Sequence, residues 1–134
     1  MKILHVSTSD MSGGAAKAAY RLHRSLLNNN IDSTMLVQNK ISDDFTVLDP
    51  NTKIQKILAY LGRKIDALPL RKYPGRQKTL FSPAIVPFSN IVQRINELAP
   101  DIVHLHWVSF GMIRIEDIEK INAWFTRRAE GLIR

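Results

Sequence analysis

Cysteine is absent from this chain, and so is any long apolar run. Without cysteine the protein can form no disulfide bond and perform no thiol chemistry, which fits a reducing cytoplasm. The first apolar stretch, Ile3 to Val6, is too short for the core of a signal peptide or for a membrane span. We therefore expect a cytoplasmic protein without a transmembrane segment.

Acidic residues are scarce relative to basic ones. The 134 residues include 12 Asp and Glu against 19 Lys and Arg, which gives a formal net charge of +7. This length leaves room for one domain with a real core and little room for two. The positive charge favours a polyanionic partner: nucleic acid, an anionic membrane surface or a phosphorylated ligand. Charge alone does not choose among them.

Apolar periodicity predicts strands and helices in alternation. Strands are expected at 3–6, 33–38, 45–48 and 101–107, and helices at 15–27, 52–68, 89–98 and 115–129. The proline-containing stretch 70–88 has no steady period and is expected to be a long ordered loop. This alternation predicts an α/β fold with a parallel sheet that carries helices on both faces.

Two adjacent glycines, Gly13 and Gly14, precede the alanine-rich helix that follows the first strand. The unpaired N–H groups at a helix start attract an anion, and Ser12 is well placed to cap the helix. The chain has neither a GxGxxG dinucleotide pattern nor a GxxxxGK[ST] phosphate loop. Two interpretations therefore stay open: an anion-binding loop, and a plain capped helix.

The rule for parallel sheets connects this loop to a distant stretch. Ligands bind at the carboxyl ends of the strands, where the strand order reverses. If the first strand lies beside the strand DIVHLHW at 101–107, then Gly13 and Gly14 share an edge with His106 and Trp107. The two stretches would then frame one cleft.

His104 and His106 lie two apart on a predicted strand, so their side chains share a face. One interpretation makes them metal ligands together with His5, although no acidic or cysteine partner stands near them in sequence. A second makes both structural. In a third, His106 faces the cleft and bonds a polar ligand. Trp107 beside it either stacks on a sugar or base or closes the core.

Basic residues accompany the predicted helix at 52–68 and the loop that follows it. They are Lys53, Lys56, Arg63, Lys64, Arg71, Lys72, Arg76 and Lys78. One interpretation is peripheral contact of 52–78 with the inner face of an anionic membrane, and the other is a helix that covers the core. Nucleic acid is not the expected partner, because no recognition motif is present.

Three blocks carry a family resemblance: KILHVSTSDMSGGAAKAAYRLHRSL, TLFSP and APDIVHLHWVSFGMIRIEDIEKI. Together they resemble the N-terminal domain of the retaining glycosyltransferases of family 4, which have the GT-B fold. The resemblance covers Met1 to about Ile121 and implies a single Rossmann-like, acceptor-side domain. It implies transfer of a sugar from a nucleotide-sugar donor to a saccharide or lipid-linked acceptor, as in polysaccharide and cell-envelope biosynthesis.

The resemblance also implies roles for particular residues. The loop of Ser12, Gly13, Gly14 and Ala15 would approach the diphosphate of the donor. His106 would act as the catalytic-site histidine that contacts the transferred sugar. No metal cofactor is implied.

The chain also departs from the family pattern. Family members carry a C-terminal donor-binding domain with a paired glutamate motif, for which 134 residues leave no space. After Ile121 a further strand is expected, but residues 122–134 form a divergent, basic tail with helical period. We therefore expect a truncated chain that is inactive alone, and a strand 101–107 exposed at the sheet edge unless the tail or another chain covers it.

These departures define the alternatives for function. Self-association, or pairing with a separate catalytic domain, would complete the architecture. The alternative to a glycosyltransferase-type protein is a non-catalytic basic module that binds a polyanion or a partner subunit.

Overall fold

The computed structural model describes residues 1–49, 53–72, 75, 82–84 and 90–131. Within them, four parallel strands form one sheet in the order β3-β2-β1-β4. The elements are β1 (Lys2–Ser9), α1 (Gly13–Asn28), β2 (Asp32–Asn39), β3 (Val47–Leu48), α2 (Lys53–Asp66), the short 3-10 helix η1 (Leu68–Lys72), α3 (Ile91–Leu98), β4 (Ile102–Leu105) and α4 (Ile115–Ala129). The predicted α/β class is confirmed, and the arrangement is that of a single Rossmann-like domain.

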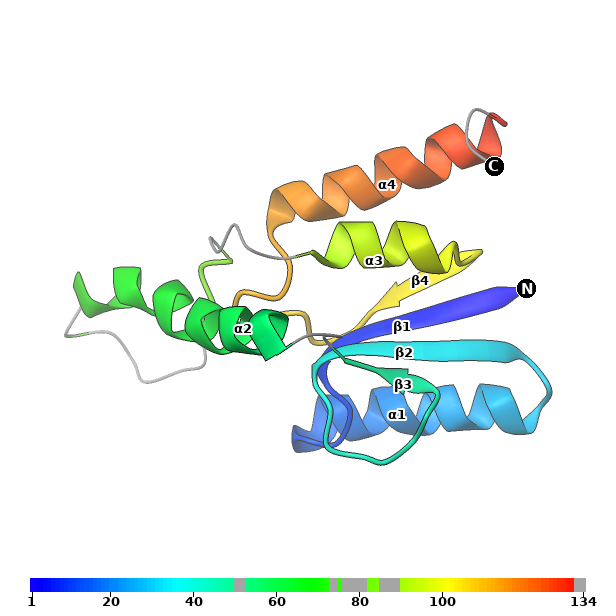
Figure 1. Cartoon of the computed structure of the whole chain (residues 1–134), viewed down its shortest axis with the longest axis horizontal. Coiled ribbons are helices and arrows are strands. Elements are labelled where there is room, and N and C mark those ends of the chain that lie inside the picture. Colours follow the sequence, from blue (N-terminus) through cyan, green and yellow to red (C-terminus); the bar gives the residue numbers. More distant parts are fainter. Residues whose placement is uncertain (50–52, 73–74, 76–81, 85–89, 132–134) are drawn as a thin grey trace.

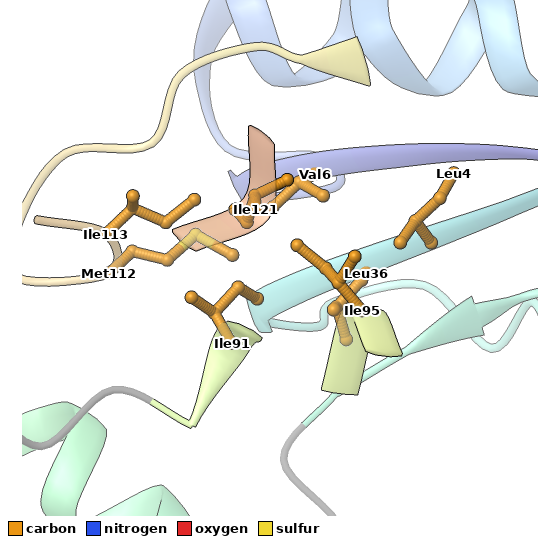
Figure 2. Packing of buried hydrophobic residues seen from close by; sticks show 8 residues of the cluster. All are labelled: Leu4, Val6, Leu36, Ile91, Ile95, Met112, Ile113 and Ile121. Atoms are coloured by element: carbon orange, nitrogen blue, oxygen red, sulfur yellow. The ribbon is translucent and has the colours of Figure 1, made fainter. Parts of the chain in front are cut away.

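Helices cover both faces of this sheet (Figure 1). Side chains from β1, β2, α3 and α4 and from the segment before α4 form the larger apolar core (Figure 2): Leu4, Val6, Leu36, Ile91, Ile95, Met112, Ile113 and Ile121. On the opposite face, Ala19 of α1 packs with Met35, Val37 and Val47. Because successive strand residues alternate between faces, Leu4 and Val6 serve one core while His5 points to the α1 side.

The first strand is longer than the apolar pattern predicts. It continues past Val6 through Ser7, Thr8 and Ser9, all of them buried. Backbone pairing with β2 holds these polar residues in the sheet, with Ser7 opposite Val37. The predicted strand ends at Val6, the last apolar residue. The observed strand ends at Ser9, the last residue paired with β2.

The helix predicted at 52–68 is present as α2, but its apolar side is largely exposed. Ile54 is 69% exposed and Ile57 is 58% exposed, and Leu58 and Leu61 are exposed as well. At these positions α2 does not cover the core. Of the loop predicted at 70–88, residues 70–72 belong to η1, and residues 73–74, 76–81 and 85–88 lie outside the described residues.

The C-terminal segment continues a helix. α4 runs through Ile121 to Ala129, as the helical period predicts, and packs against α3. Arg128 donates to the backbone oxygens of Ala99 at 3.0 Å and Pro100 at 2.7 Å. In the strand order of the described residues, β4 forms one edge of the sheet, and the side chains of Ile102 and His104 on it are exposed. Among the described helices, none has both the length and the apolarity that a membrane crossing requires.

Candidate functional site

A cavity of about 400 Å³ lies at the carboxyl end of β1, where the chain turns into α1. The turn from Ser12 to Ala16 forms one part of its lining, and Trp107 and Phe110, which follow β4, form another. Asn39 at the end of β2 adds a polar group. The structure thus brings the predicted loop residues Ser12, Gly13, Gly14 and Ala15 together with Trp107 around one cavity.

The geometry of this turn depends on glycine. Gly13 has a φ of +88°, a conformation that side chains of L-residues rarely adopt. At Gly14, a Cβ atom built on the backbone would meet nothing within 4 Å. Since Gly14 also lines the cavity, its missing side chain leaves open space at the first turn of α1.

The predicted side-chain cap by Ser12 is wrong. Ser12 occupies the N-cap position, but its side chain makes no capping hydrogen bond. Its backbone N–H instead donates to Ser9 Oγ at 3.3 Å, so the hydroxyl that closes this turn belongs to Ser9. The N–H groups of the first turn of α1 therefore receive no hydroxyl from Ser12, at the place where the cavity opens.

A buried carboxylate directly after β1 binds the segment that follows β2. Asp10 is fully buried and accepts hydrogen bonds from the backbone N–H groups of Ile41 and Ser42, both at 2.9 Å. Burial alone would raise the pKa of Asp10, but the hydrogen bonds from Ser42 and Ile41 outweigh it and lower the pKa. Sequence reasoning missed Asp10, although a carboxylate directly after the first strand marks the ligand-binding end of a parallel sheet.

Trp107 is held in the cavity wall by its backbone. Its carbonyl oxygen accepts hydrogen bonds from the N–H and the hydroxyl of Thr8, each at 2.7 Å. The side chain remains 44% exposed. An aromatic ring in this position offers a flat apolar surface to a sugar or base.

The neighbouring wall residue, Phe110, is tied to a serine that sequence reasoning did not single out as a site residue. The Phe110 N–H donates to Ser82 Oγ at 2.9 Å, and the Ser82 hydroxyl donates to the buried carboxylate of Asp66. Ser82 belongs to the TLFSP block, of which residues 79–81 lie outside the described part of the chain. The only sequence signal for Ser82 was its place in that block.

His106 is not among the residues that line the cavity. Its Nε2 lies 3.0 Å from Nδ1 of His5, and the two rings stack with centroids 5.2 Å apart. His104 lies beside both, with ring centroids 5.5 Å from His5 and 4.2 Å from His106. The structure therefore gathers the three histidines together, separately from Ser12 to Ala15.

The surroundings keep two of these rings uncharged at neutral pH. Burial, together with the smaller effects of the neighbouring His106, His104 and His23, lowers the pKa of His5 to about 4. Burial also lowers the pKa of His106, with a smaller effect from His104. A neutral imidazole keeps a lone pair on one nitrogen, which can accept a hydrogen bond or bind a metal.

No protein-family model, curated protein or solved structure matches this chain. The chemistry of the site therefore follows from its own residues.

A second surface is formed by α2. Its exposed apolar residues Ile54, Ile57 and Leu61 lie on the same helix as Lys56, which forms an ion pair with Asp49 at 2.7 Å. The ammonium group of Lys64 lies 4.8 Å from the ring centre of Tyr60. Of the predicted basic run, Arg76 and Lys78 lie outside the described residues. The described part combines exposed apolar groups with positive charge.

Proposed function

We propose that this protein binds the diphosphate of a nucleotide sugar at the N-terminus of α1, as a glycosyltransferase-type, acceptor-side domain. The observation that carries the proposal is the Gly13–Gly14 turn, which opens the first turn of α1 onto the cavity beside Trp107. The resemblance of the sequence blocks to family 4 glycosyltransferases points to the same ligand class.

The turn has the properties that a diphosphate site needs. A helix N-terminus presents backbone N–H donors and the positive end of the helix dipole. With no side chain at Gly14, a phosphate oxygen can approach the backbone closely. None of the described lining residues is ionisable, so attraction comes from these donors and from the net charge of +7.

Trp107 supplies the second part of the proposed site. Its half-exposed ring borders the cavity and can pack against the apolar face of a sugar or base. A cavity of about 400 Å³ is within the ordinary size range of small-molecule sites. The proposed contact between His106 and the transferred sugar requires the His106 ring to turn away from His5.

The proposed activity of the chain alone is binding without sugar transfer. Transfer requires groups that stabilise charge on the leaving diphosphate and that assist the acceptor. The described lining consists of hydroxyl, amide, aromatic and small apolar groups, which supply neither strong positive charge nor a base. Sugar transfer by the purified chain would contradict this part of the proposal.

A calorimetric titration of the purified chain with UDP- and GDP-sugars, at two salt concentrations, tests the proposal. We expect saturable binding that persists at the higher salt concentration. Gly14→Val and Trp107→Ala should each weaken it by about tenfold or more, since each removes one part of the site. Ala18→Val, which enlarges an exposed position of α1 away from the cavity, should bind as the wild type does.

The opposite result would favour the alternative function. Binding that disappears with added salt and is equal in all variants indicates a basic module that recruits polyanions without a defined site. Absence of saturable binding in a folded chain would reject the diphosphate site.

The exposed face of α2 favours a second component of the function. We propose that α2 contacts an anionic membrane surface, where a lipid-linked acceptor would reside. The specific observation is the exposure of Ile54, Ile57 and Leu61 on a helix that also carries Lys56 and Lys64. Apolar groups enter the lipid interface while basic groups meet anionic headgroups.

A further inference from the structure

Three histidine side chains meet where β1 and β4 lie side by side. His5 of β1 pairs in register with His104 of β4, and His106 follows two residues later on the same face. One ring nitrogen from each residue lies within 4.8 Å of those from the other two. Among the described residues, this is the group of side chains placed to hold a metal ion.

We propose that His5, His104 and His106 bind a divalent transition-metal ion, with Zn²⁺ as the best match. Imidazole nitrogen is a preferred ligand of Zn²⁺, and three protein ligands leave a fourth position for water or another ligand. His104 is exposed whereas His5 is 1% exposed, so the cluster extends from the interior to the surface. A metal ion can therefore enter from the side of His104.

The fourth histidine of the chain shows what a purely structural role involves. His23 is fully buried, and both of its ring nitrogens have partners: Ser33 Oγ and Thr46 Oγ1, each at 2.8 Å. In His5, by contrast, Nδ1 faces only another imidazole and Nε2 is buried without a hydrogen-bond partner in the described part of the chain. Hydrogen bonding thus accounts for His23 but leaves His5 incompletely satisfied.

The spacing of the nitrogens suits a tetrahedral site. With Zn–N bonds of about 2.0 to 2.1 Å, two ligand nitrogens lie about 3.3 Å apart. His5 Nδ1 and His106 Nε2 are already 3.0 Å apart. The ligand nitrogens of all three residues lie within 4.8 Å of one another, and the exposed ring of His104 can change rotamer readily to bring its nitrogen to a metal ion.

The proposed metal site is separate from the diphosphate-binding turn, although it shares His106 with the proposed sugar contact. None of the three histidines is among the residues that line the cavity. They lie on or next to β1 and β4, whereas Gly13 and Gly14 begin α1. Zinc binding is therefore expected without any nucleotide, and it can fail or succeed independently of diphosphate binding.

A zinc titration of the chelator-treated, tag-free chain tests this proposal. We expect calorimetry to show one Zn²⁺ per chain, and Co²⁺ to give the visible absorption of a tetrahedral site. His104→Ala should weaken Zn²⁺ binding by about tenfold or more, because it removes one of three ligands. As His104 is exposed, this variant is expected to fold, whereas loss of buried His5 risks the fold.

Ile102→Ala provides the matched control. Ile102 is exposed on the same face of β4, two residues before His104, and offers no ligand atom. This variant should bind Zn²⁺ as the wild type does, and Zn²⁺ should raise the melting temperature of both but not of His104→Ala. Equal binding by His104→Ala and the wild type, or no saturable one-to-one binding, would overturn the proposal.

Discussion

Thr8 binds the carbonyl oxygen of Trp107 through both its backbone N–H and its hydroxyl, each at 2.7 Å. These bonds join the carboxyl end of β1, an interior strand, to the segment that follows the edge strand β4. Because the bonds reach the backbone of Trp107, they fix its position while the ring remains half-exposed in the cavity wall. The aromatic wall of the cavity thus depends on a polar residue at the end of β1.

Thr8→Val should loosen this connection without altering the shape of the side chain greatly. The hydroxyl's bonds to the carbonyl oxygens of Trp107, at 2.7 Å, and Ser109, at 3.2 Å, are lost while the backbone bond remains. We therefore expect the free energy of unfolding to fall by about 1 kcal/mol. Denaturant unfolding measures this loss. If Trp107 is part of the ligand site, Thr8→Val should also weaken ligand binding, whereas Thr8→Ser, which keeps the hydroxyl, should preserve it.

The two glycines should respond differently to alanine. Gly13→Ala places a side chain at a φ of +88°, and we expect a loss of about 1 to 2 kcal/mol in unfolding free energy. Gly14→Ala meets no atom within 4 Å and lies inside the helix, so it should raise stability slightly, by about 0.5 kcal/mol. Urea denaturation of both variants provides the measurement, and equal effects would show that the turn is not as described.

Through Asp44, the free energy of unfolding should depend on pH in the acidic range. Burial alone would raise its pKa, but hydrogen bonds from Thr46 and Tyr20, together with Arg24, lower the pKa from 3.8 to about 2. Since the pKa is lower in the folded protein, the ionised carboxylate stabilises the fold. This contribution, about 2 kcal/mol, is complete above about pH 4 and is lost as the pH falls towards about 2.

Asp44→Asn therefore should lower stability at neutral pH and flatten its dependence on pH between about 4 and 2. Thermal unfolding across this range is the measurement. The exposed neighbour gives the control, because Asp43→Asn should leave the slope nearly unchanged. An unchanged slope in Asp44→Asn would show that other carboxylates carry the acid sensitivity.

Membrane contact by α2 should depend on its exposed apolar residues. Ile57→Ser should reduce binding to vesicles containing phosphatidylserine by about tenfold, because one isoleucine no longer enters the interface. Ile57 is 58% exposed, so its loss should hardly alter folding stability. Co-sedimentation with vesicles measures the binding.

Ile41→Ser controls for the loss of an exposed isoleucine elsewhere, since Ile41 is 57% exposed and lies outside α2. It should bind vesicles as the wild type does. Equal loss in both variants, or equal binding to neutral phosphatidylcholine vesicles, would contradict a specific anionic contact through α2.

Apolar periodicity was sufficient to predict the order of the α-helices and strands, because most of these elements place apolar residues at a regular spacing. It was insufficient where polar residues are buried or apolar residues are exposed. The strand predicted at 3–6 extends to Ser9 because its hydroxyl-bearing residues pair through their backbones. Conversely, Ile54 and Ile57 lie at helical spacing but are exposed in the described structure.

The location of the candidate site could be predicted from the sequence, but the hydrogen bonds of its side chains could not. Parallel sheets bind ligands at their carboxyl ends, so the loop at Gly13 and Gly14 could be matched with Trp107. The partners of individual side chains depend on tertiary distances that spacing does not contain. This is why Ser12 was expected to make a capping bond that is absent. It is also why the grouping of His5 with His104 and His106 was only one of three interpretations, without the direct contact between His5 and His106.

Strand β4 joins β1 across most of the chain, since His106 follows His5 by 101 residues. Contacts that close so long a loop carry a large entropy of closure and slow the folding of parallel sheets. Trp107 and the two histidines of this segment reach their places in the same event. The cavity wall and the three-histidine cluster therefore form together when the chain folds. A metal ion bound by the cluster would stabilise the slowly formed, long-range pairing of β1 with β4.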